Sequence, residues 1–148
     1  MYQTYLQTPI GSLRIVSDGS EITEISVCDT AGEDNPDALT QQAAAELKEY
    51  FAGMRTAFDL PLAPQGTAFQ KSVWTALRQI SFGKTVTYGD LAKQIGKPTA
   101  ARAVGSAIGK NPILILQPCH RVLATNGLGG FSAGLDRKKH LLLLEQKR

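Results

Sequence analysis

The feature that most constrains this chain is a proline- and glycine-containing segment, PLAPQG at residues 61–66, where the charge changes sign. Residues 1–64 carry 3 Lys or Arg against 10 Asp or Glu, whereas residues 65–148 carry 13 against 3. Proline and glycine interrupt regular structure, so we expect two small domains, 1–62 and 63–148. The net charges of −7 and +10 fit a second domain that meets a polyanion, most plausibly nucleic acid, or one with a solvated basic surface.

Composition and the short apolar runs exclude several classes of protein. A chain with 43% hydrophobic and 20% charged residues is typical of a folded globular protein. Its longest aliphatic runs, Ile113–Leu116 and Leu141–Leu144, are too short to span a bilayer, and the first ten residues lack a secretory signal pattern. We therefore expect no membrane partner and an intracellular location, cytoplasmic or, in a eukaryote, nuclear.

The few cysteines and histidines limit disulfide and metal chemistry. Cys28 and Cys119 cannot form a disulfide framework, which favours a reducing compartment. With only two histidines as well, the usual four-ligand zinc site has little support, and we expect no metal.

The first domain reads as strands followed by a helix. Short apolar runs are separated by Pro9–Gly11 and Asp18–Gly19, which suit hairpin turns. After a polar stretch, apolar residues at helical spacing predict one amphipathic helix, with Leu47, Tyr50, Phe51 and Met54 on its buried face. The expected fold is a small α/β lobe.

The second domain reads as mostly helical. Thr67 with Gln70, and Thr87 with Asp90, form capping-box patterns that begin two helices, and Gly96 ends the second. A third helix is expected over Thr99–Ile108. Two short helices joined by a tight turn are typical of a helix-turn-helix.

The third predicted helix is unusual because nearly all its side chains are small. Arg102 is its one large polar residue, and the others are mainly Ala, Gly and Ser. Small residues allow a helix to approach another surface closely. That surface fits either a DNA groove or a neighbouring helix.

The strongest chemical signal lies in Asn111–Val122, where an apolar, strand-like run leads to Cys119 followed by His120 and Arg121. A thiol acts as a nucleophile after losing its proton, and a neighbouring imidazole and guanidinium favour the thiolate. A single cysteine is also common as core filling. Both interpretations stand on these residues alone.

The run Pro118–Val122 (PCHRV) resembles the active-site signature of the O6-alkylguanine-DNA alkyltransferase family. The resemblance covers essentially the whole second half, through the motifs VTYGDLA, AARAVG, GKNP and GFSAGL at 86–92, 100–105, 109–112 and 130–135. The first half is similar more weakly, chiefly at Thr8–Leu13. The implied fold is a ribonuclease H-like α/β lobe, a small antiparallel sheet plus a helix, followed by a mostly α, winged helix-turn-helix-like domain that binds DNA and holds the active site.

The resemblance implies direct DNA repair without a cofactor. Family members flip O6-alkylguanine, and also O4-alkylthymine, out of double-stranded DNA and transfer the alkyl group irreversibly to a cysteine. Cys119 is the matching residue here, so each molecule would act once as a methylated-DNA–protein-cysteine methyltransferase. The implied partner is duplex DNA containing O6-alkylguanine, bound by a monomer, with clustering along DNA left open.

Individual roles follow from the same resemblance. His120 matches the general base that acts on the thiol through a bridging water, Glu145 the carboxylate that orients it, and Arg121 a structural brace. Asn111 matches the residue that braces the helix-turn-helix, and Tyr88 the donor to guanine N3. The substrate pocket would include Tyr88, Val122, Phe131 and Ser132, and DNA would contact Thr99, Ala100, Ala101, Gly105 and Arg102, the last as the finger that fills the stack.

Some features keep other interpretations open. By sequence alone, Glu145 also fits a surface charge near a helix end, and Tyr88 a core tyrosine. Phe131 and Ala133 stand where family members carry Tyr and Gly, which puts the preference for bulky adducts in question. Two other classes remain, a non-catalytic reader of alkylated DNA and a Cys-His hydrolase; Cys119 argues against the first, and the basic Arg102 helix against the second.

Overall fold

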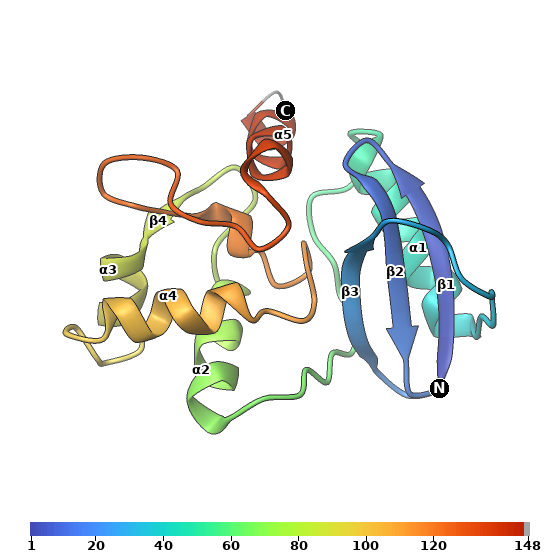
Figure 1. Ribbon diagram of the computed structural model, residues 1–148, viewed down its shortest axis with the longest axis horizontal. Helices are drawn as coiled ribbons and strands as arrows, with labels where there is room; N and C mark the ends of the chain where they lie inside the picture. Colours follow the sequence, from blue (N-terminus) through green and yellow to red (C-terminus); the bar gives the residue numbers. More distant parts are fainter. Residues whose placement is uncertain (147–148) are drawn as a thin grey trace. The chain divides into compact units, whose positions relative to one another are not determined.

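The computed structural model describes residues 1–146 (Figure 1). They form two compact units, and the boundary between Gln65 and Gly66 lies within the predicted linker at 61–66. The first unit is an antiparallel sheet with one helix. The second is mostly helical. In the part of the chain that the structure describes, no helix is long and apolar enough to cross a membrane.

The sheet of the N-terminal unit is a meander of three strands in the order β1-β2-β3. The strands are β1 (Tyr2–Thr8), β2 (Gly11–Ser17) and β3 (Ile22–Cys28), with Leu13 opposite both Leu6 and Val27. Both predicted hairpin turns form, and each uses a glycine with positive φ, Gly11 at 109° and Gly19 at 101°.

Helix α1 (Ala38–Phe51) packs on β1 and β2 and completes this unit, as expected for the α/β lobe. Asp37 caps its first turn, and Leu47 and Tyr50 are buried. Met54 was expected on the same face but is 77% exposed. The helix ends at Phe51, and Gly53 then turns the chain with φ of 82°, so the predicted stripe stops one turn early.

The C-terminal unit contains four helices and a minimal sheet among its described residues. Both predicted capping boxes form, Thr67 with Gln70 and Thr87 with Asp90. The elements are α2 (Ala68–Leu77), β4 (Val86–Thr87), α3 (Tyr88–Gln94), α4 (Ala101–Gly109), the 3₁₀ turn η1 (Cys119–Arg121), β5 (Val122–Leu123) and α5 (Leu135–Gln146), with β4 and β5 parallel.

Helices α3 and α4 form the expected helix-turn-helix, but α4 starts at Ala101 rather than at Thr99. Its cap residue, Ala100, has no side chain that could bond to the first turn. Val104, Ala107 and Ile108 are buried against the unit's core, and Trp74 Nε1 donates to Ala107 O at 2.9 Å.

The opposite face of α4 is exposed and carries Arg102, Ala103 and Ser106. The small residues therefore serve both interpretations left open by the sequence. Ala107 allows close helix packing, while Ala103 and Ser106 leave a smooth outer surface around Arg102.

The strand predicted through Ile113–Leu116 does not form, and this segment is a series of tight turns instead. Leu116 N donates to Leu114 O at 2.8 Å, and Ile115 between them has φ of 71°. The side chain of Asn111 bonds to Ile113 N and Gln117 O. Because these backbone groups are satisfied locally, they have no need of a neighbouring strand.

Removal of the α3 cap tests whether local chemistry fixes this element. Thr87→Ala should lower the free energy of unfolding by about 1 kcal/mol, because the N–H of Asp90 loses its acceptor. Urea unfolding followed by the fluorescence of Trp74 reports on the C-terminal unit alone, since that is the chain's one Trp. Thr85→Ala, at an exposed position outside the cap, is the control and should change the midpoint little.

Candidate active site

The sequence-predicted nucleophile, Cys119, lies at the start of η1 and is only 2% exposed. Burial raises the pKa of its thiol to about 11, an effect opposed by a hydrogen bond from the Asn111 side chain and by the positive charge of Lys138. The resting sulfur at neutral pH is therefore a thiol. This differs from the expectation that His120 and Arg121 would hold it as a thiolate.

His120 follows the cysteine and is fully buried, with Nε2 at 2.7 Å from Oε2 of Glu145. A carboxylate accepts, so Nε2 carries the hydrogen and Nδ1 presents its lone pair. Nδ1 is buried and makes no hydrogen bond to the described residues. Burial lowers the pKa of His120 against the raising effect of Glu145, which keeps the imidazole neutral and able to accept a proton.

Glu145 is 2% exposed, so it is no surface charge. Its carboxylate also receives the guanidinium fork of Arg121, with Nε to Oε1 at 2.8 Å and Nη2 to Oε2 at 3.0 Å. Nη1 of Arg121 donates to Ile80 O at 2.7 Å. The charge of Arg121 is thus directed at Glu145 and the Ile80 carbonyl, which explains why it does little for the thiol.

Lys138 is a functional candidate that the sequence reasoning missed. It is fully buried, and its Nζ donates to Val122 O at 2.7 Å, Leu128 O at 2.5 Å and Gly130 O at 2.9 Å. The ammonium group therefore ties β5 to the loop after it and places a positive charge near Cys119. Burial lowers the pKa of Lys138, and the charge of the Cys119 thiolate opposes this.

The signal for Lys138 was its spacing on α5. Lys138, Leu141 and Glu145 lie three and four residues apart and are the buried residues of this helix. The neighbouring Leu143 is 59% exposed. Helical spacing counted from Glu145 identifies Lys138 as a buried residue, whereas hydrophobicity alone misses Lys138 and selects the exposed Leu143.

Tyr88 is the first residue of α3, and its side chain packs against two glycines that are distant in the sequence, Gly105 and Gly129. A Cβ on Gly105 of α4 would lie 3.8 Å from its ring, and one on Gly129 would lie 2.6 Å from its hydroxyl. Gly129 also has φ of 72°, and Gly130 N donates to the Tyr88 hydroxyl at 3.1 Å. Tyr88 thus joins the helix-turn-helix to the loop that Lys138 holds, and Gly105, a predicted DNA contact, is half-buried beside its ring.

Asn111 lies just after α4 and braces the turns that lead to Cys119. Its Nδ2 donates to Gln117 O at 2.8 Å, and its Oδ1 accepts from Ile113 N at 3.0 Å. The other predicted residues differ in exposure. Val122 is buried, Phe131, Ala100 and Ala101 are half-buried, and Ser132, Thr99 and Arg102 are exposed.

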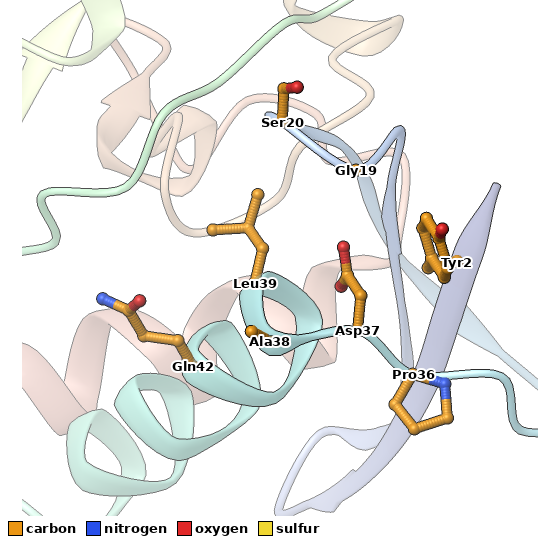
Figure 2. A pocket seen from close by; sticks show the side chains of 8 residues that line it. All are labelled: Tyr2, Gly19, Ser20, Pro36, Asp37, Ala38, Leu39 and Gln42. Atoms are coloured by element: carbon orange, nitrogen blue, oxygen red, sulfur yellow. The ribbon is translucent and has the colours of Figure 1, made fainter.

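One hollow of about 680 Å³ lies in the N-terminal unit at the start of α1, lined by Tyr2, Leu39 and Asp37 among others (Figure 2). Both carboxylate oxygens of Asp37 are already engaged, by Ser17 Oγ at 2.6 Å and Thr40 N at 2.8 Å. This hollow therefore offers no reactive group comparable with Cys119. Over residues 1–146, no group of three or more His, Cys, Asp or Glu could hold a metal ion.

Comparison with known proteins covers both units. Residues 68–147 match the family model described as 6-O-methylguanine DNA methyltransferase, DNA binding domain, and residues 1–64 match its ribonuclease-like domain. The chain belongs to the O6-methylguanine DNA methyltransferase family. The ribonuclease-like lobe and the helix-turn-helix domain expected from the sequence are both confirmed.

Individual relatives agree with this family across almost the full chain. A methylated-DNA–protein-cysteine methyltransferase of Methanosarcina acetivorans is 44% identical, over 98% of each chain. One of Haemophilus influenzae is 44% identical, over 99% of this chain and 87% of that one. The structure of the Mycobacterium tuberculosis protein OGT in complex with DNA matches with a TM-score of 0.91 and 42% identity, covering 99% of this chain and 94% of that one.

The protonated state of the Cys119 thiol leads to a testable pH dependence. With the thiol pKa near 11, carbamidomethylation of Cys119 by iodoacetamide in a Cys28→Ser protein should accelerate about tenfold per pH unit between pH 7 and 9. Mass spectrometry of the Cys119 peptide measures the rate. A plateau reached near neutral pH would show instead that the resting sulfur is a thiolate.

Proposed function

We propose that this protein repairs DNA by transferring the alkyl group of O6-alkylguanine in duplex DNA to Cys119, once per molecule. The observation that carries the proposal is the buried Cys119-His120 pair whose imidazole is oriented by Glu145, in a chain of this family. A nucleophile, a base and an orienting carboxylate in this order are the groups that displacement by a thiol requires.

In the proposed reaction, the thiol proton passes through a bridging water to Nδ1 of His120 as the sulfur attacks the alkyl carbon. The S–C bond forms and the C–O6 bond breaks, and its electron pair stays on the guanine. The guanine then takes up one proton, which balances the one lost by the thiol, and leaves as the neutral base. The product thioether has no good leaving group, so the cysteine is consumed.

Tyr88 is proposed to assist departure of the guanine by donating to ring N3. Its oxygen already accepts from Gly130 N, so its own hydrogen is available to a substrate. A donor at this place stabilises the negative charge that develops on the ring as the C–O6 bond breaks. Phe131, Ser132 and Val122 complete the proposed substrate pocket.

The proposed DNA surface is the exposed face of α4 with its flanking residues. Arg102 is exposed there beside Ala103 and Ser106, and the C-terminal half of the chain carries the net charge of +10. A guanidinium plane can stack on bases while its N–H groups reach the orphaned partner base. We assign Arg102 to the space that the flipped nucleotide leaves, with Thr99, Ala100 and Ala101 beside it.

The proposal also concerns the compartment, the oligomeric state and a second substrate. A thiol nucleophile must remain reduced, which places the protein in a reducing compartment beside the DNA. All the proposed groups come from one chain, so one monomer should serve one lesion. O4-alkylthymine would be a second substrate.

The stoichiometry of transfer tests the nucleophile. Incubation with a duplex containing O6-methylguanine should add one methyl group per protein by intact mass, located on Cys119, with no turnover beyond one equivalent. Cys119→Ala should gain no methyl group but keep DNA binding. Methyl transfer by this variant would refute the assignment, and binding without transfer by the wild type would identify a non-catalytic reader.

Two substrates distinguish the proposed role of Arg102 in base flipping from that of Tyr88 in the departure of the guanine. Arg102→Ala should slow repair of duplex O6-methylguanine by about one to two orders of magnitude, the scale of a base-flipping cost of a few kcal/mol. Its second-order rate constant with the free base O6-benzylguanine, which needs no flipping, should stay near that of the wild type.

Tyr88→Phe is the matched variant for comparison with Arg102→Ala. It should slow both reactions, because both substrates contain the guanine ring to which the Tyr88 hydroxyl is proposed to donate. Equal losses on both substrates in Arg102→Ala would show that Arg102 supports the fold or the pocket rather than the flipped state.

A further inference from the structure

Gln117 is a buried polar residue that the proposed reaction leaves unexplained. It lies two residues before Cys119, its exposure is 0%, and its position within the apolar run Ile113–Leu116 and Pro118 would suit a hydrophobic side chain. Only one end of its amide is satisfied. Nε2 donates to Asn111 Oδ1 at 2.8 Å, whereas the buried Oε1 makes no hydrogen bond to the described residues.

The two amides of Asn111 and Gln117 form a closed pair. Asn111 Nδ2 donates to the Gln117 backbone carbonyl at 2.8 Å, while Gln117 Nε2 donates back to Asn111 Oδ1. The same Gln117 carbonyl accepts from Cys119 N at 2.7 Å. The pair thus connects the end of α4 directly to the backbone of the nucleophile.

The contacts of the Asn111 amide, to which the Gln117 side chain adds one, determine which end of the amide faces the sulfur. Asn111 Oδ1 accepts from two N–H groups, Ile113 N and Gln117 Nε2, and a flipped amide would turn its NH₂ against both donors. The NH₂ group is therefore held beside the Gln117 carbonyl, which also accepts from Cys119 N, and a hydrogen bond from this side chain lowers the pKa of the Cys119 thiol.

We propose that Gln117 is a positioning residue for the alkyl transfer, acting through Asn111 by holding its NH₂ group toward the Cys119 sulfur. The inference rests on the proposed function for its place in the reaction. The effect of the Asn111 NH₂ group, which favours the negatively charged form of the Cys119 sulfur, does not depend on which alkyl donor reacts. An N–H aimed at the sulfur gains strength as the thiol becomes a thiolate, so it acts more on the transition state than on the resting protein.

The unpartnered Oε1 shows that Gln117 is not explained by stability. Burial of an acceptor without a partner is unfavourable, and an apolar side chain of similar length would remove this cost. Asn111 Oδ1 would still accept from Ile113 N. A residue kept for stability should therefore weaken the fold when replaced, whereas Gln117→Met should leave the free energy of unfolding unchanged or higher.

The test compares Gln117→Met with Leu116→Met, an apolar exchange at the neighbouring buried position, both in a Cys28→Ser protein. Three quantities are measured for each, the rate with O6-benzylguanine, the pH dependence of Cys119 carbamidomethylation by iodoacetamide, and the free energy of unfolding in urea. His120, Arg121, Lys138 and Glu145, the titratable groups near the sulfur, stay unchanged in both variants.

Gln117→Met should react about three- to tenfold more slowly with both reagents, the effect of one weakened hydrogen bond, and its carbamidomethylation profile should move to higher pH. Leu116→Met should keep the parent rates. In an Asn111→Ala background, Gln117→Met should have no further effect on either rate, because Gln117 acts through that side chain.

Three results would overturn the proposal: unchanged rates and pH profile in Gln117→Met, a loss of rate that parallels a loss of stability, or an equal loss in the Asn111→Ala background. The iodoacetamide measurement separates this proposal from the proposed function. A parent protein that does not take up the methyl group from a duplex containing O6-methylguanine contradicts alkyl transfer, while the shift in carbamidomethylation still tests Gln117.

Discussion

The C-terminal unit depends on one buried carboxylate. Glu145 receives His120 Nε2 at 2.7 Å and the guanidinium fork of Arg121, so the end of α5 is joined to the turn that carries Cys119. Removal of this carboxylate would leave a buried guanidinium without its counter-charge, which typically costs about 3–5 kcal/mol. The same contact fixes the imidazole tautomer, so the group that holds the turn in place also prepares the base.

Burial of the nucleophile shapes the chemistry of the site. A thiol with a pKa near 11 is unreactive toward solvent molecules at neutral pH, and the groups that favour its ionised form, Asn111 and Lys138, lie around it inside the protein. This arrangement suits a cysteine that is used once. In the proposed reaction, it protects the sulfur until a substrate enters the proposed pocket and the proton can pass to His120.

The helix-turn-helix and the loop that contains Gly129 and Gly130 are joined through Tyr88. Gly129 on the loop leaves room for this side chain, Gly105 on α4 lies beside its ring, and Gly130 N donates to its hydroxyl. Lys138 holds the same loop by its carbonyls at Leu128 and Gly130. If α4 contacts DNA as proposed, a change in its position would be transmitted to the proposed substrate pocket by direct packing.

Local signals in the sequence determined the helix starts, the hairpin turns and the cysteine signature, because a capping box or a turn glycine needs only neighbouring residues. The tertiary structure decided the rest. Lys138 and Glu145 are buried while Leu143 is exposed, since what covers α5 is set by residues distant in the sequence. The run Ile113–Leu116 forms turns rather than the expected strand because its backbone N–H groups bond locally, Ile113 N to the Asn111 side chain and Leu116 N to Leu114 O. Likewise, the protonation state of Cys119 follows from burial, which the adjacent His120 and Arg121 could not predict.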